Sequence, residues 1–198
     1  MKKKLVLLTV LVFGLSVALM SYATAQVKPT EKNFIAPKVA LNSIQISYWE
    51  GFWHYGKAAV AKGKAPKFGG SSPVTLDFVF EITNPNPFPV ELDSAQFFLF
   101  FDDYDLRVVN DSNTQWIPAG KTNTKVLHVT LTATTTWAKF LLAGKELAAK
   151  RGDDPWEKVE EWWLGLPDMS FPIDLKDGAF VFEAGGIVKA VPIKIRYP

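Results

Sequence analysis

Few side chains in this sequence could carry acid–base, nucleophilic or metal chemistry. The chain has no cysteine, which excludes disulfides, thiolate nucleophiles, iron–sulfur clusters and cysteine-ligated zinc. Its two imidazoles are His54 and His128, and neither lies in a sequence motif that supplies the serine and the aspartate of a catalytic triad. We therefore expect surface histidines, no catalytic residues, no cofactor and no enzymatic activity.

The carboxylates between residues 102 and 111 are the best candidates for a metal site. Asp102, Asp103 and Asp105 lie shortly before Asn110 and Asp111, and oxygen ligands of this kind suit calcium. The segment lacks the central glycine and the terminal glutamate of an EF-hand loop. We interpret it instead as an acidic turn between two strands and expect no metal.

The first 25 residues have the pattern of a secretory signal peptide. Three lysines, Lys2–Lys4, precede an apolar run from Leu5 to Met20, and Ala23-Thr24-Ala25 supplies a cleavage site. This pattern predicts export to the periplasm or the extracellular space, with residues 26–40 as a mobile tether. The alternative is an uncleaved N-terminal anchor, although the 16 residues of the apolar run would span only about 24 Å as a helix.

The net charge of the exported chain is close to zero. The full chain has 22 basic and 20 acidic residues, and loss of the three signal-segment lysines leaves 19 and 20. Such a chain offers no basic surface for the phosphates of a nucleic acid, so we expect no nucleic-acid partner. A hydrophobic content of 48% also distinguishes it from a disordered protein.

An alternation of apolar and polar residues runs through the body of the chain, residues 41–198, and predicts β-strands. In residues 76–82 the even positions are apolar, which is typical of a half-buried antiparallel strand. In residues 94–101, aromatic side chains occupy both odd and even positions, which predicts a central strand covered on both faces. We expect further strands at 127–131, 171–175 and 191–197, with Lys176-Asp177-Gly178 as a hairpin turn.

Two segments within residues 135–165 have helical spacing instead. Apolar residues recur every three or four positions from Trp137 to Ala148, and Asp154 with Pro155 provides the N-cap and first turn of a second helix. Because neighbours on a helix point about 100° apart, we expect one of Trp162 and Trp163 to be exposed or to be covered by the segment near Tyr48. The whole pattern predicts an all-β, immunoglobulin- or fibronectin-III-like antiparallel β-sandwich with a short helical insertion.

The most distinctive motif of the chain is Asn84-Pro85-Asn86-Pro87-Phe88-Pro89. Its three prolines remove successive N–H donors along one side of an extended chain, and each residue before a proline is held extended. We therefore expect a stiff exit from the preceding strand that blocks pairing at that edge. The asparagine side chains are expected to bond to nearby backbone groups.

The run from Phe78 to Leu92, with this motif at its centre and an aromatic strand after it, resembles the water-stress-and-hypersensitive-response (WHy) domain of the late-embryogenesis-abundant type 2 family. The downstream order agrees: a turn at residues 117–120, a strand, a short helix and a strand at 173–176. The resemblance covers about residues 41–198. It implies a β-sandwich without an active site, linked to tolerance of desiccation and other stresses, in a wider family connected with membranes and lipids.

An aromatic segment that begins at Tyr48 offers a candidate binding surface, because tryptophan and tyrosine favour half-wet apolar boundaries. If it meets the tryptophans of the second helix, the two form an apolar patch. The alternative is a first strand that pairs into an aromatic core. The residues of the candidate patch are Tyr48, Trp49, Phe52, Trp53, Trp162 and Trp163.

We therefore expect a monomeric, non-catalytic stress-protection module that contacts a membrane surface, a lipid or a client protein. Two alternatives stay open. One is a module that binds or transfers a lipid or small hydrophobic ligand between splayed sheets lined by phenylalanine. The other is a subunit or adaptor of an envelope complex, whose tryptophan surface is covered by a partner chain.

Overall fold

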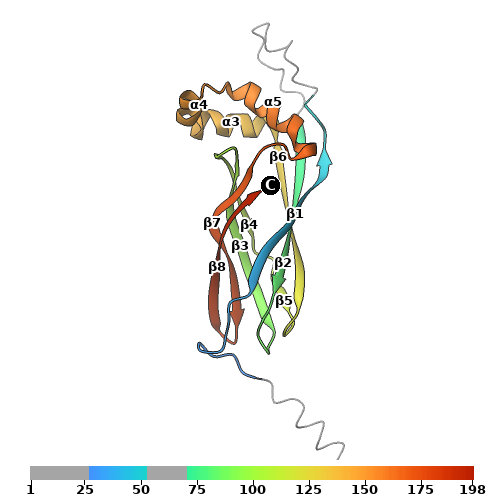
Figure 1. Cartoon of the computed structure of the whole chain (residues 1–198), viewed down its shortest axis with the longest axis vertical. Coiled ribbons are helices and arrows are strands. Elements are labelled where there is room, and N and C mark those ends of the chain that lie inside the picture. Colours follow the sequence, from blue (N-terminus) through green and yellow to red (C-terminus); the bar gives the residue numbers. More distant parts are fainter. Residues whose placement is uncertain (1–26, 53–70) are drawn as a thin grey trace, which may run out of the picture.

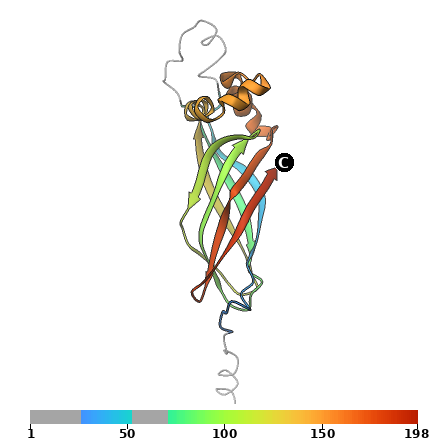
Figure 2. The same ribbon diagram turned by 90° about the vertical axis from the view of Figure 1, so that its left-hand side faces the viewer.

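Two antiparallel sheets packed face to face form the body of the protein, and a group of helices covers one end of them (Figures 1 and 2). The computed structural model describes residues 27–52 and 71–198. The smaller sheet has the order β1 (Lys38–Trp49), β2 (Pro73–Thr83), β6 (Thr122–Thr132). The larger sheet has the order β4 (Tyr104–Asp111), β3 (Val90–Phe101), β7 (Ile173–Ala184), β8 (Ile187–Tyr197), and the short β5 (Gln115–Ile117) also pairs with β3.

The helices lie between β6 and β7 in the sequence: α3 (Ala133–Ala143), α4 (Lys145–Arg151), α5 (Pro155–Gly165) and the short 3-10 helix η2 (Leu166–Asp168). This architecture confirms the expected all-β sandwich with a helical insertion. Within the two described ranges, no helix is long and apolar enough to cross a membrane. The expected signal segment, Trp53 and His54 lie outside the described residues.

The alternation predicted for residues 76–82 is confirmed in β2, where Leu76, Phe78 and Phe80 are fully buried and the intervening residues are not. Rings of β2 meet rings of the opposite sheet. The ring centroids of Phe80 and Phe180 are 4.9 Å apart, and those of Phe78 and Phe97 are 5.8 Å apart. Both pairs have the edge-to-face geometry that aromatic rings favour. Phenylalanine side chains therefore fill the space between the sheets.

The hairpin turn predicted at residues 176–178 is wrong. β7 continues through this segment, and its register with both β3 and β8 shifts next to Gly178, as in a β-bulge. A Cβ atom at Gly178 would overlap the carbonyl oxygen of Gln96 on β3. The residues that suggested a turn instead allow two neighbouring strands to approach closely.

The prediction that residues 94–101 are covered on both faces is also wrong. Phe97, Leu99 and Phe101 of β3 are fully buried against the other sheet, but Phe98 and Phe100 lie half-exposed on the outer face. No second layer covers that face in the described part of the chain. Long side chains partly shield it, and the ammonium of Lys176 lies 4.0 Å from the centroid of the Phe100 ring.

The helix expected from Trp137 to Ala148 is divided at Gly144 into α3 and α4. Gly144 faces Tyr104, and a Cβ atom at this position would lie 2.9 Å from an atom of the tyrosine ring. A glycine is therefore needed for the helices to lie against β4. The second helix begins as predicted, because the Asp154 carboxylate accepts two backbone N–H bonds from the first turn of α5.

The prediction of a mobile tether at residues 26–40 is wrong for its second half, which belongs to the folded domain. Phe34 is 1% exposed and packs edge-on against Phe88, with ring centroids 6.1 Å apart. The ammonium of Lys189 on β8 donates a 2.6 Å hydrogen bond to the Phe34 carbonyl and lies 5.4 Å from the Phe34 ring centroid. Because a large apolar side chain before β1 is buried, the domain begins earlier than the expected boundary at residue 41.

We expect Phe34→Ala to lower the free energy of unfolding by about 3–5 kcal/mol, because it removes a fully buried ring and leaves a cavity. Urea denaturation of a chain that begins at Gln26 measures this loss. Ile35→Ala is the matched control, since Ile35 is exposed and its removal is expected to change stability by less than about 0.5 kcal/mol. Equal losses from the two variants would mean that the segment is a tether after all.

Candidate interaction surfaces

The Asn84–Pro89 segment carries the chain from one sheet to the other and is held by its own asparagines. Asn84 is fully buried, and its amide nitrogen donates to the carbonyls of Phe88 (2.9 Å), Ile117 (3.0 Å) and Pro118 (3.2 Å). Its amide oxygen accepts the backbone N–H of Asn86 at 2.9 Å, as the expected turn requires. Asn84 thus joins the crossover to the turn that precedes β6.

Asn86 extends this network to the N-terminal segment. The N–H of Ile35 donates to Asn86 Oδ1, and Asn86 Nδ2 donates to the Ile35 carbonyl, both at 2.7 Å. The side-chain amide therefore pairs with Ile35 much as a neighbouring strand would. Because these bonds engage both asparagine side chains in the interior, the motif stabilises the crossover and gives no support for a ligand site.

Trp162 and Trp163 of α5 are both fully buried, so the first of the two alternatives for them, exposure of one ring, is wrong. Each indole has its own polar partner. Trp162 Nε1 donates to Asp102 Oδ2 at 2.7 Å, and Trp163 Nε1 donates to the Ser72 carbonyl at 2.7 Å. Trp162 and Trp163 do point in different directions from α5, but this helix is covered on more than one side. Each ring therefore packs against a different part of the core. The rings around Trp162 are those of Phe101, Tyr104, Phe140 and Phe171.

The described members of the aromatic segment at the end of β1 differ in exposure. Tyr48 and Trp49 are exposed. Phe52 is buried, and its ring centroid lies 5.6 Å from that of Trp156 on α5. The aromatic-core alternative therefore holds for Phe52, and the six-residue patch does not form.

Leucines at the helical end are exposed, and we did not predict this exposure from the sequence. Leu142 is 86% exposed, and Leu141 and Leu164 are exposed as well. Phe140, Leu141 and Leu142 are consecutive, and three consecutive residues of a helix cannot all face one core. Because Phe140 is buried, this run of apolar residues could have indicated from the sequence that a leucine here is exposed. Single apolar side chains are also exposed elsewhere, including Val188 beside the β7–β8 hairpin at the other end (Figure 1).

The carboxylates of the candidate calcium segment link elements of the fold to one another. Asp103 accepts a 2.9 Å hydrogen bond from Arg151 on α4, and this bond lowers the pKa of Asp103. Within the described residues, no group of three or more potential ligands gathers. The other ion pairs are Asp102 with Lys158 (3.0 Å), Asp103 with Lys176 (4.0 Å), Asp105 with Lys139 (3.1 Å) and Asp111 with Lys125 (2.6 Å).

His128 has a polar partner that the sequence did not indicate. Its Nδ1 lies 2.7 Å from Oδ1 of Asp77 on the adjacent strand β2, and the hydroxyl of Ser47 on β1 donates to the same oxygen at 2.8 Å. A nucleophilic triad needs the histidine between serine and aspartate, whereas here the aspartate lies between the other two. The arrangement therefore links β1, β2 and β6 on the outer face of their sheet and does not activate the serine.

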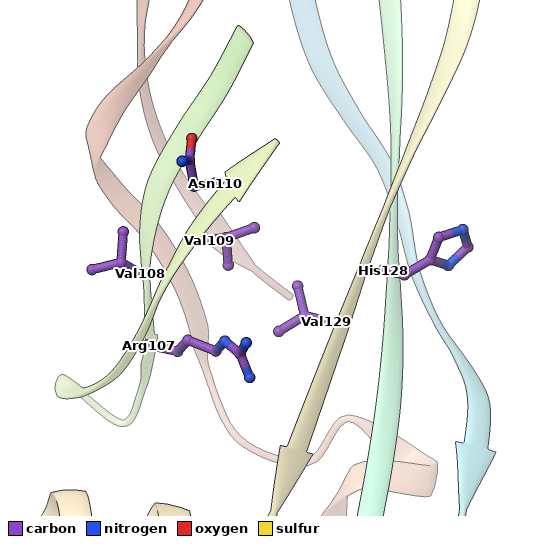
Figure 3. Close-up of a pocket in the computed structure, with 6 residues that line it drawn as sticks. All are labelled: Arg107, Val108, Val109, Asn110, His128 and Val129. Atoms are coloured by element: carbon purple, nitrogen blue, oxygen red, sulfur yellow. The ribbon is translucent and has the colours of Figure 1, made fainter. Parts of the chain in front are cut away.

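A shallow hollow of about 220 Å³ opens on one side of the sandwich, between β4 and β6 (Figure 3). The side chains of Arg107 on β4 and Val129 on β6 point toward each other across it (Figure 3). Val108 and His128 also line the hollow, but their side chains point away from it (Figure 3), so they contribute mainly their main chains. The hollow is smaller than typical sites for drug-sized ligands.

Comparisons with known proteins give distant structural similarities. No family model and no curated protein matches the chain. A solved protein from Archaeoglobus fulgidus has a TM-score of 0.43 and 9% identity, covering 80% of this chain and 94% of its own. A Northeast Structural Genomics Consortium target solved by X-ray crystallography has a TM-score of 0.43 and 8% identity, covering 81% and 85%. Similarities this weak do not bear on function.

Proposed function

We propose that the protein is an exported, non-catalytic module that protects other proteins during water stress, as its resemblance to the late-embryogenesis-abundant type 2 family implies. In this proposal, apolar side chains at the helical end contact client proteins that have begun to unfold. The observation that supports it is the exposure of Leu142, which is 86% open to solvent beside the exposed Leu141. Grouped apolar side chains at a surface are typical of contact sites.

The charge of the helical end favours protein clients over an anionic membrane. Residues 133–168 contain five basic and seven acidic side chains, so the helical insertion itself carries a small negative excess. Anionic lipid headgroups attract basic segments and repel acidic ones. A partly unfolded protein presents apolar surface without a uniform negative charge, and it therefore suits this surface better.

The packing between the sheets gives no support to the lipid-binding alternative. The phenylalanines that would line an acyl-chain cavity contact one another across the sheets, as the 4.9 Å separation of the Phe80 and Phe180 centroids illustrates. Rings in contact at this position fill the space that an acyl chain would need there. An adaptor role would use the same exposed end as client binding, and no separate observation favours it.

We expect the mature chain from Gln26 to suppress the aggregation of heated citrate synthase, followed by light scattering. Leu142→Ser should raise the concentration needed for half suppression about tenfold, because it removes an exposed leucine that the client would bury. Val188→Ser is the matched control, since Val188 is 60% exposed on β8. This control should behave as the wild type does.

Two results would count against this proposal. Equal loss of protection in the two serine variants would mean that the helical end is not the site that contacts clients. If the wild type gives no protection but sediments with phosphatidylglycerol vesicles through Leu142, membrane binding would replace client binding as the function.

A further inference from the structure

β6 is an edge strand that contains neither a bulge nor a proline, two of the features that prevent pairing with another chain. Its pairing with β2 runs from Thr122 to Thr132 without a register shift. Apart from the three-residue β5, the other described edge strands are β1, β4 and β8; their pairings all contain shifts, and β8 also contains Pro192. Bulges and prolines protect sheet edges from added strands. β6 has neither, so it remains a regular template.

The even-numbered residues of β6 turn their backbone groups away from β2. The Thr130 carbonyl accepts from Arg107 Nη1 at 2.6 Å, and the Thr124 carbonyl accepts from Gln115 Nε2 at 3.1 Å, both from the other sheet. Along an antiparallel strand, the N–H and C=O of one residue point to the same side and alternate with those of the next. The backbone groups of Val126 and His128 therefore face the same gap. In the described part of the chain, β2 is the only strand that pairs with β6.

The hollow between β4 and β6 lies against this open stretch of backbone. His128 lines it with its main chain, because its imidazole points away (Figure 3). The side-chain bridges at Thr124 and Thr130 lie on either side of the stretch, and a third bridge joins Lys125 to Asp111. Within the described residues, the backbone from Val126 to His128 is the part of this stretch that no side chain bonds. The gap thus combines main-chain groups that face away from β2 with a small apolar floor at Val129.

Arg107 places a positive charge at the hollow that no described carboxylate neutralises. Its bond to Thr130 goes to a neutral carbonyl, and none of the ion pairs in the described residues includes it. A guanidinium has five N–H donors and binds carboxylates in a fork geometry. A carboxylate brought to the hollow would therefore meet complementary charge.

We propose that the side of the sandwich between β4 and β6 binds an extended acidic segment of another protein. The segment adds to β6 as a further strand and exchanges backbone hydrogen bonds with Val126 and His128. One of its carboxylates pairs with Arg107. This surface is separate from the exposed leucines of the helical end, so it provides a second, sequence-selective mode of contact.

A capped octapeptide that alternates valine and threonine around one central glutamate tests this proposal on the mature chain. In amide NMR spectra, the largest shifts should occur at Val126, His128 and Arg107, and the first two amides should exchange with solvent about tenfold more slowly at saturation. Arg107→Gln should weaken binding about tenfold, and replacing the peptide glutamate by glutamine should do the same. Lys194→Gln on β8 is the control and should leave the affinity unchanged.

The competing occupants give different results. N-acetylglutamate alone should bind far more weakly than the octapeptide, and equal binding would mean that the hollow is a site for small carboxylates and not for a strand. A peptide with N-methylated backbone amides on alternate residues should not bind, since it cannot pair with β6. Shifts confined to β8 or the helical end, or no binding at millimolar peptide, overturn the proposal, as does concentration-dependent self-association through β6.

Discussion

Asn84→Ala is expected to lower the free energy of unfolding by about 3 kcal/mol, which is among the largest effects of any polar substitution in this chain. The reason is that Asn84 is fully buried and its amide serves three carbonyls and the N–H of Asn86. Alanine leaves these groups in the interior without partners. For a domain of this size the midpoint of thermal unfolding should fall by roughly 6–12 °C, measured by circular dichroism.

Asn113→Ala is the matched control for this experiment. Asn113 also hydrogen bonds through its amide, to Asp111 at 2.6 Å, but it is exposed, so water can replace the lost bond. Its removal should change stability by less than about 0.5 kcal/mol. If the two alanine variants lose the same stability, the buried asparagine network does not hold the crossover between the sheets.

Trp162→Ala is expected to cost about 3–5 kcal/mol, because it removes a fully buried indole from the centre of a ring cluster. It also removes the 2.7 Å hydrogen bond from Nε1 to Asp102, which ties α5 to the turn between β3 and β4. Urea denaturation followed by circular dichroism measures the loss. Trp162→Phe should recover most of the packing and lose mainly the hydrogen bond, at about 1–2 kcal/mol.

Trp116→Ala serves as the control for Trp162→Ala, since Trp116 is 59% exposed on β5 and its side chain is not part of the core. A small effect at position 116 with a large one at position 162 would support the arrangement of α5 described above. A small effect at both would mean that the helical insertion is loosely attached and that Trp162 does lie at a surface.

The strands that the sequence predicted correctly are those with one wet face. β2 and β6 alternate strictly, because one side of each contacts the core and the other contacts solvent. The predictions fail where a local pattern has two structural explanations. Lys176-Asp177-Gly178 is typical of a turn, yet Gly178 is required by the close approach of β3, a contact between residues about 80 positions apart.

The candidate site was harder to predict than the fold, because its composition depends on which segments meet. Trp162 and Trp163 diverge on their helix as expected, but only the three-dimensional arrangement shows that both directions are covered. Ser47, Asp77 and His128 are far apart in the sequence and meet through strand register. The open edge of β6 likewise depends on sheet order, which a single sequence does not specify.

The two proposed surfaces differ in the chemistry they offer. The helical end presents apolar side chains, led by Leu142, that would bury any apolar client surface with little selectivity. The edge of β6 offers main-chain groups and the charge of Arg107, which select an extended acidic segment. A protection module that uses both could recognise particular partners and also shield partly unfolded ones.

Site-specific photo-crosslinking measures whether the protein contacts its clients through the helical end. A photoreactive amino acid replaces Leu142 in one variant and Val188 in another, and each is irradiated with citrate synthase held at a temperature where it unfolds. We expect a yield of crosslinked client several times higher from position 142, and little from either position with the folded enzyme. Equal yields from the two positions, or a higher yield from position 188, would contradict this expectation.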